Sequence, residues 1–378
     1  MLEIFLLIIF TLLIIHYIIF LLIVYKGILK LRSSSSYQIP EDFVSVIIPF
    51  RNESENILES LGSIESQNYP KDKFEVFYVD DFSTDDSVEI LKKNKNKENI
   101  KIVSVTEDYS ISAYKKRAVR YGIENSRGGI IVTTDADCIH DKSWLKYLLQ
   151  NFDEETGFVS GPVEFMDDEK FFSKIQKIEF AGLVLAGAGL IGSGKPTICN
   201  AANIAYRRKV YNEVGGFKDQ LSLSSGDDEL LMQKIARDTN YRIKFSIDQK
   251  SVVKTISSKN IGEFYQQRKR WASKGLFYND KNLIFKLILI YLFYVGLMAQ
   301  VWLSIVLSWH FLITLILSLI LKVIFELLII TKGKRLLFFR LSLKTFIAAE
   351  FFQIFYIIVA GFTGMFGNLK WKERKIKR

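Results

Sequence analysis

Three absences narrow the class of protein before any motif is considered. The chain of 378 residues has only two cysteines, Cys138 and Cys199, which excludes a disulfide framework. Its net charge is +10, yet the cations form no separate basic module that would suggest nucleic acid. Formal charge is absent from residues 4–25 and 287–321, and a membrane span needs about 20 apolar residues. We therefore expect an integral membrane protein with no nucleic-acid partner.

The first apolar run is interpreted as an anchor that remains in the mature protein. It lacks both the basic leader and the small-residue cleavage site of a signal peptide. We assign residues 1–26 to this anchor and residues 27–42, with four consecutive serines, to a linker. Lys26, Lys30 and Arg32 directly follow the anchor, so the middle of the chain is expected in the cytoplasm.

The second apolar run predicts a hairpin of two membrane helices. As one helix it would be roughly 52 Å long, too long for a single crossing. We place the turn near Ser308 and a C-terminal transmembrane region of two to three segments at 283–367. Its last segment, about 345–367, either spans or lies at the interface, because a third crossing would put the basic tail 368–378 outside.

Between these regions, apolar runs alternate with helical segments. Strands are predicted at 43–49, 74–79, 100–105 and in the run of β-formers that begins the stretch 129–138, which favours a parallel sheet with crossover helices. Acidic residues directly follow two of the predicted strands: the pair Asp80 and Asp81, and the pair Asp135 and Asp137. The carboxyl ends of parallel strands share one edge of a sheet, where nucleotides bind.

Asp135 and Asp137 are candidates for a metal site. On an extended backbone, carboxylates two positions apart point the same way, and hard oxygen donors suit Mg²⁺ or Mn²⁺ with a phosphate oxygen completing the shell. Taken alone, the pair fits a solvated turn equally well. His140 is close in sequence, but a lone histidine after such a loop is more often a helix-start or surface residue, so we leave it out of the site.

The ordered set of motifs resembles glycosyltransferase family 2, whose members have the GT-A fold. The resemblance covers roughly residues 43–275. It rests on Val44–Glu53, Asp80-Asp81, Lys115, Asp135-x-Asp137, Cys199–Arg208, Val214–Phe217, Gly226-Asp227-Asp228-Glu229 and Gln267-x-x-Arg270-Trp271. The last motif is typical of the membrane-bound branch, which includes cellulose, chitin and hyaluronan synthases and ceramide-type glucosyltransferases.

The resemblance implies an α/β fold, with a Rossmann-like GT-A domain at 43–256 that binds a nucleotide sugar, flanked by N- and C-terminal transmembrane helices. An interfacial helix at 257–282 would carry the Gln-x-x-Arg-Trp motif. The implied nucleotide-sugar contacts are Pro49, Arg51, Glu53, Asp80, Asp81, Lys115, Asp135 and Arg270. The implied metal ligands are Asp137 and Asp135, holding Mg²⁺ or Mn²⁺. The implied catalytic residues are Asp228, Asp227, Arg270, Trp271 and Gln267, and the acceptor-proximal residues are Asn200, Ala201, Asn203 and Trp271.

Several of these roles keep an alternative. Asp228 is the expected base, with Asp227 in its place if the motif shifts by one residue, and an acidic helix start without catalysis is the structural alternative. Gln267, Arg270 and Trp271 share one helix face, where Arg270 would hold the diphosphate and Trp271 would stack at the acceptor entrance. An alternative role for residues 268–270 is a basic cluster at the membrane surface, and we expect both roles on different faces of one interfacial helix.

The segment from Phe165 to Phe180 has the apolar spacing of a helix. That helix either lies on the membrane or faces the protein core. The glycine- and alanine-rich run 181–191 that follows is too short to span, and its small residues permit close packing.

We expect an inverting, metal-dependent transferase that moves sugar from a nucleoside diphosphate sugar, with a UDP-sugar favoured, to a lipid or glycan acceptor in the membrane. The expected location is the cytoplasmic face of a bacterial inner membrane. The alternatives are a processive polysaccharide synthase, a catalytically inactive membrane assembly subunit, and a nucleotidyltransferase. A nucleotidyltransferase function would not explain the Gln-x-x-Arg-Trp motif. The sequence predicts no oligomeric state.

Overall fold

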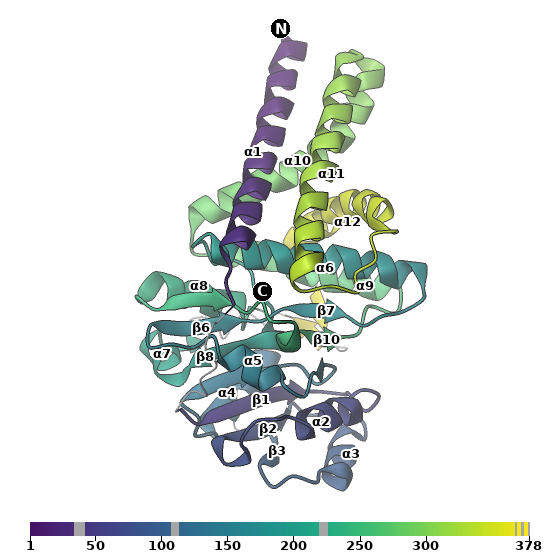
Figure 1. Ribbon diagram of the computed structural model, residues 1–378. Helices are drawn as coiled ribbons and strands as arrows, with labels where there is room; N and C mark the ends of the chain where they lie inside the picture. Colours follow the sequence, from purple (N-terminus) through teal and green to yellow (C-terminus); the bar gives the residue numbers. More distant parts are fainter. Residues whose placement is uncertain (34–41, 107–112, 219–225, 367–368, 372–373, 377–378) are drawn as a thin grey trace.

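The computed structural model describes residues 1–33, 42–106, 113–218, 226–366, 369–371 and 374–376. Half of the expected linker 27–42, residues 34–41, lies outside these residues. Figure 1 shows an α/β domain at one end of the molecule and long helices at the other. Helices α6 Phe171–Gly192 and α9 Ile261–Ala272 lie crosswise between them.

The central sheet has seven strands in the order β3-β2-β1-β4-β8-β6-β9. The first four strands in the chain are parallel, as predicted. β8, which was not among the predicted strands, is antiparallel to both of its neighbours, β4 and β6, so the complete sheet is mixed. The bounds are β1 Val44–Phe50, β2 Phe74–Asp80, β3 Ile100–Ser104, β4 Ile130–Thr133, β6 Thr156–Ser160, β8 Ile204–Arg207 and β9 Arg242–Phe245.

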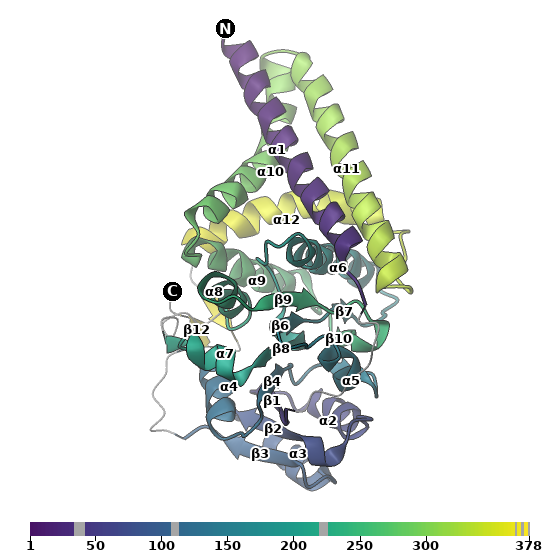
Figure 2. The same ribbon diagram turned by 60° about the vertical axis from the view of Figure 1, so that its left-hand side comes forward.

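Both faces of this sheet are buried. Val46 and Ile48 of β1 belong to one hydrophobic cluster, whereas Ile47 between them belongs to the other. Because side chains alternate along a strand, a continuous apolar run such as β1 requires cover on both faces. Helices supply that cover (Figure 2): α2 Ile57–Glu65, α3 Ser87–Asn94, α4 Tyr114–Glu124, α5 Trp144–Leu149, α7 Arg208–Glu213 and α8 Glu229–Asp238.

A smaller sheet joins the domain to the crosswise helices. Its strands are β5 Ile139–His140, β10 Val253–Thr255 and β7 Val163–Phe165, with β10 in the middle. The short 3₁₀ turns are η1 Lys71–Lys73, η2 Ala201–Asn203, η4 Gln249–Ser251 and η5 Ser273–Phe277.

Among the described residues, five helices are long and apolar enough to cross a membrane. Three of them, α1 Leu2–Lys30, α10 Lys281–Val306 and α11 His310–Leu336, project away from the sheet (Figure 1). The two predicted helices and the turn near Ser308 are present, because α10 and α11 are separated only by residues 307–309. The fourth, α12 Phe346–Phe366, runs across the others rather than alongside them (Figure 2).

The fifth apolar helix, α6 Phe171–Gly192, corrects the expectation for residues 165–180. Phe165 belongs to β7, and the helix begins only at Phe171, where Asp168 accepts hydrogen bonds from the Lys170 amide and the Ser173 hydroxyl. The helix then continues through the glycine- and alanine-rich run as one element. In the most apolar 18-residue stretch of α6, 72 % of the residues are buried, which supports the interpretation that this helix faces the protein core.

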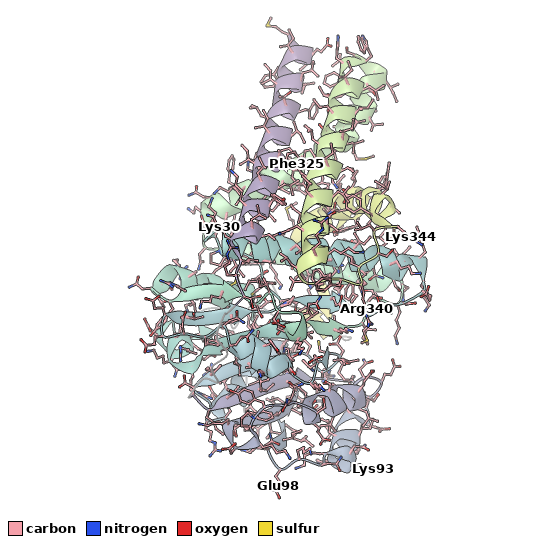
Figure 3. All side chains as sticks on the ribbon, in the orientation of Figure 1. Lys30, Lys93, Glu98, Phe325, Arg340 and Lys344 are labelled. Atoms are coloured by element: carbon pink, nitrogen blue, oxygen red, sulfur yellow. The ribbon has the colours of Figure 1, made fainter. Side chains whose placement is uncertain are left out.

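Glycines allow α6 to pack very closely against α1. A Cβ atom on Gly27 would lie 1.8 Å from the Gly189 carbonyl oxygen, so any larger residue there would force the two helices apart. Helix α1, which projects away from the sheet, is thereby packed directly against α6, which lies crosswise between the sheet and the long helices. Figure 3 places Lys30, Arg340 and Lys344 near the level where the long helices meet the α/β domain.

Polar contacts fix α12 in its crosswise position. The Lys322 ammonium of α11 contacts Glu350 and, at 2.8 Å, the Gln353 side-chain oxygen, both on α12. The same ammonium also lies 3.0 Å from Glu326 Oε1, four residues further along α11. In the basic tail, β11 Leu369–Trp371 pairs with β12 Arg374–Ile376, a hairpin that the sequence had not indicated.

Candidate active site

One cavity of about 450 Å³ collects most of the predicted site residues. It lies at the carboxyl ends of β1 and β4, and the crosswise helices α6 and α9 Ile261–Ala272 form its opposite wall. Its lining includes Pro49, Arg51, Glu53, Asp81, Lys115, Asp135, Asp137, Asn200, Ala201, Asp227, Asp228, Gln267, Arg270 and Trp271. Asp80 and Asn203 are the predicted residues that are not part of this lining.

Lys115 organises the carboxylates at the sheet edge. Its ammonium lies 2.5 Å from Asp135 Oδ1 and 3.8 Å from Asp227 Oδ2. Burial acts to lower the pKa of Lys115, but the charges of Asp135 and Asp227 outweigh it, so this pKa is raised above its usual value. Lys115 therefore stays charged and holds together two acidic residues from distant parts of the chain.

Asp135 and Asp137 both line the cavity, although the backbone turns at residues 136–137 instead of staying extended as the sequence argument assumed. The Thr255 hydroxyl of β10 donates to Asp137 Oδ2 at 3.3 Å. No group of three His, Cys, Asp or Glu side chains able to hold a metal occurs in the described part of the chain. Two carboxylates nevertheless fit Mg²⁺ or Mn²⁺, because Mg²⁺ is usually held by one or two carboxylates together with substrate phosphates.

Of the acidic pair at the end of β2, the structure brings only Asp81 to the cavity. Arg117 Nε of α4 donates to Asp81 Oδ1 at 2.9 Å, and Arg51 Nη1 donates to the Asp81 carbonyl at 3.0 Å. Asp80 instead accepts a hydrogen bond of 2.9 Å from the Ser83 amide and stabilises the turn. Asp81 is thus the member of the pair placed to contact a nucleotide.

Asp228 lies deep in the cavity at the start of α8. Gly226 just before it has φ +86°, a conformation that favours glycine. Asp228 Oδ2 accepts from the Ala201 amide at 3.0 Å, and the Lys274 ammonium lies 3.5 Å from Oδ1. Burial acts to raise the pKa of Asp228, but Lys274 and the Glu229 amide lower it, so the net shift is downward. This carboxylate is therefore ionised at neutral pH.

The acceptor-proximal loop is divided between two roles. Asn200 and Ala201 line the cavity, whereas Asn203 is fully buried outside it. The Asn203 side chain accepts from Trp144 Nε1 and donates to the carbonyls of Pro162 and Ser251. The structure gives Asn203 a role in holding the loop.

Gln267, Arg270 and Trp271 line the cavity from one face of α9, as their spacing indicates. Burial lowers the pKa of Arg270, while Asp227 and Asp135 act in the opposite direction. The alternative of a basic cluster on the membrane surface was wrong for Arg268 and Lys269, which are only 3 % and 9 % exposed. Arg268 turns away from the cavity and forms a buried ion pair with Glu179 of α6.

Comparison with known proteins identifies the family. The profile described as "Glycosyl transferase family 2" matches residues 45–215. Glycosyltransferase AglE of Haloferax volcanii is 32% identical over 236 residues, which are 62% of this chain and 72% of that protein. The chain belongs to glycosyltransferase family 2.

This glycosyltransferase is also similar to a polysaccharide synthase in sequence and to a mannosyltransferase in fold. Poly-beta-1,6-N-acetyl-D-glucosamine synthase of Staphylococcus epidermidis is 25% identical over 247 residues, 61% of this chain and 54% of the synthase, so the match spans about half of that protein. The mannosyltransferase PcManGT from Pyrobaculum calidifontis, solved in complex with GDP-Man and Mn2+, has a TM-score of 0.59 at 21% identity over 96% of this chain and 99% of its own. The GT-A fold is thereby confirmed.

The sequence analysis of this glycosyltransferase missed Glu229, Lys274 and Tyr278, which also line the cavity. Burial raises the pKa of Glu229 to about 7, and Lys274 opposes the shift. Glu229 stood in the quoted Gly-Asp-Asp-Glu motif, so its position was a usable signal. Lys274 lies three residues after Trp271, and nothing in its surrounding sequence links it to Asp228.

His140 is not part of the cavity lining, and its environment differs from the expectation. It is buried rather than on the surface, and its ring nitrogens contact the hydroxyls of Ser63 and Thr134. Burial lowers the pKa of His140 to about 3, so the ring is neutral.

Proposed function

We propose that this glycosyltransferase is an inverting, metal-dependent enzyme that transfers a sugar from a UDP-sugar to a lipid or glycan acceptor at the cytoplasmic face of a membrane. The observation that carries the proposal is the single cavity shared by Asp135, Asp137, Asp228 and Arg270. Each requirement of the reaction has a side chain in that one space.

The proposed chemical step needs a base and a stabilised leaving group. Asp228 takes the proton of an acceptor hydroxyl, and the freed oxygen attacks the anomeric carbon of the donor. The bond from that carbon to the diphosphate breaks as the new glycosidic bond forms, which inverts the configuration. Arg270 sits where its guanidinium can offset the charge gained by the diphosphate.

Asp135 and Asp137 are the proposed ligands of a divalent cation. When bound, the cation would supply a second positive charge for the diphosphate. Lys115 keeps the Asp135 carboxylate in place beside Asp137, and Thr255 helps to orient Asp137. Asp81 and Arg51 are proposed to contact the nucleoside at the sheet end of the cavity.

The membrane origin of the acceptor is supported by the wall opposite the sheet. Leu183, Val184 and Gly187 of α6 line the cavity, and this same helix packs tightly against α1. An acceptor that enters from the bilayer would therefore meet an apolar wall beside Trp271. Lys30 and Arg340 near the base of the long helices favour a cytoplasmic catalytic domain, with α12 at the interface.

The experiment is a donor panel with the purified full-length protein in detergent. Release of nucleoside diphosphate should be greatest with one UDP-sugar and should fall when Mn²⁺ and Mg²⁺ are chelated. GDP-sugars belong in the panel because PcManGT was solved with GDP-Man. No release from any donor would refute the function, and release of pyrophosphate would indicate a nucleotidyltransferase instead.

A processive polysaccharide synthase is the second candidate, favoured by the relative named poly-beta-1,6-N-acetyl-D-glucosamine synthase. Product length distinguishes the two. Single addition yields one product per acceptor, whereas processive synthesis yields a ladder or a high polymer when radiolabelled donor is supplied.

A further inference from the structure

Glu229 is a buried carboxylate in the cavity that the proposed reaction does not use. It is the first residue of α8, directly after Asp228, and it is 6 % exposed. Its Oε1 atom is buried and has no hydrogen-bond partner, and the residue belongs to the cavity lining. The Tyr278 hydroxyl and the Lys274 ammonium are the neighbours that partly offset the burial of this carboxylate. A ligand hydroxyl that donates to Oε1 would add the hydrogen bond that this atom lacks.

Lys274 is the nearest cation to this oxygen, but it lies beyond hydrogen-bonding distance. Its ammonium is 3.6 Å from Glu229 Oε1 and 3.5 Å from Asp228 Oδ1. The Lys274 side chain is 11 % exposed and lines the same cavity. The pair therefore offers an acceptor atom and a donor group side by side, next to the proposed base.

We propose that Glu229 and Lys274 form a hydroxyl-binding subsite for the acceptor. A hydroxyl placed between them donates to Glu229 Oε1 and accepts from the Lys274 ammonium. Because Asp228 is adjacent, this hydroxyl is a neighbour of the one that loses its proton to Asp228. The acceptor class is therefore a sugar or other polyol head group with at least two close hydroxyls.

This inference rests on the proposed function and goes further by choosing among acceptors. An acceptor whose nucleophile is a phosphate oxygen has no hydroxyl for Glu229, and its charge would face Asp228, Asp227 and Glu229 together. A site built to hydrogen-bond a hydroxyl discriminates strongly against an analogue that lacks it, because its own polar group is then left unpaired.

The test uses the full-length enzyme in a zwitterionic detergent that contains no sugar. The acceptor probes are octyl glycosides of glucose, mannose, galactose and N-acetylglucosamine, their monodeoxy derivatives, and decyl phosphate. At least one octyl glycoside should be glycosylated, and decyl phosphate should not. One monodeoxy derivative of that glycoside should show a KM raised by about tenfold or more.

Two variants assign that hydroxyl to Glu229. Glu229→Met removes the acceptor atom and should raise the KM for the glycoside by about tenfold or more, with no further penalty for the deoxy derivative. Glu229→Gln keeps an oxygen acceptor and should give an intermediate KM. The dissociation constant of the nucleoside diphosphate should not follow this order, which separates acceptor binding from a general loss of structure.

Asp238→Asn is the matched control, because Asp238 is an exposed carboxylate at the other end of α8. It should leave the KM for the glycoside unchanged. The proposal is overturned if no octyl glycoside is glycosylated, if decyl phosphate is the better acceptor, or if Glu229→Met keeps the wild-type KM. A wild-type enzyme that releases no nucleoside diphosphate from any donor would instead refute the proposed function itself.

Discussion

The two ends of the cavity hold their charges in different ways. At the sheet end, charged groups lie close to their partners: Lys115 is 2.5 Å from Asp135, and Arg117 Nε is 2.9 Å from Asp81. At the helix end, Lys274 stands 3.5 and 3.6 Å from its two carboxylates. The sheet end is organised before substrate arrives, whereas the helix end leaves polar atoms for the acceptor.

This difference fits what each end is proposed to bind. A nucleoside diphosphate brings a large charge that fixed dipoles and ions must meet without reorganisation. An acceptor brings hydroxyls, which need nearby donors and acceptors that are not already satisfied by one another. Variants at the helix end should therefore change transfer more than nucleotide binding, and variants at the sheet end should change both.

The largest effect is expected at the proposed base. Asp228→Asn should lower the rate of transfer by about a thousandfold, because an amide cannot take the proton of the acceptor hydroxyl. Asp227→Asn, the neighbouring carboxylate, should cost much less. Transfer rates and UDP affinity measured for both variants check this. Full activity in both variants would refute the assignment, and loss only in Asp227→Asn would move the base by one residue.

At the sheet end, Asp137→Asn should lower transfer by about a hundredfold and weaken the binding of UDP in the presence of Mn²⁺. The same variant should bind UDP about as weakly as the wild type does after chelation. Titration calorimetry with and without Mn²⁺ gives both values, with the exposed Glu154→Gln as the control. A variant that still gains affinity from Mn²⁺ would contradict the role of Asp137.

Lys274→Met tests how the helix end keeps its base ionised. The pKa of Asp228 lies below its usual value mainly because Lys274 opposes the effect of burial, so removing the cation should raise that pKa. A base is active only above its pKa, and the acid limb of kcat/KM should move to higher pH. At the acid side of the profile, we expect about a tenfold loss per unit of pKa shift.

The control for this profile is Lys281→Met, which removes an exposed cation at the start of α10. Its acid limb should coincide with that of the wild type. Lys274→Arg keeps the positive charge and should restore most of the profile. An unshifted acid limb in Lys274→Met would show that other groups keep Asp228 ionised.

Features set by local pattern could be predicted from the sequence. The strands before Asp81 and Asp135 follow from short apolar runs, and the α10–α11 hairpin follows from the length of one uncharged run. The shared face of Gln267 and Arg270 follows from helical spacing. In each case the residue pattern that supports the prediction lies within about one helix or strand of the chain.

Features set by contacts between distant residues could not be predicted. Asp81 was not separable from Asp80, because what distinguishes them is a pairing with Arg117 of α4. The burial of Arg268 depends on Glu179, and Lys274 of η5 meets Asp228 across 46 positions of the chain. The antiparallel β8 likewise reflects the path of the chain through α6, which no local pattern records.

The smallest effect is expected from Thr255→Val, which removes the hydroxyl that donates to Asp137 Oδ2 at 3.3 Å and keeps the shape of the side chain. A neutral donor lost at this distance is worth about 1 kcal/mol or less, so UDP affinity in Mn²⁺ should fall by roughly threefold. Acceptor KM should stay constant, because Thr255 belongs to the sheet end. If acceptor KM rose as much as the UDP dissociation constant, the two ends would be coupled through β10, and the division between them would fail.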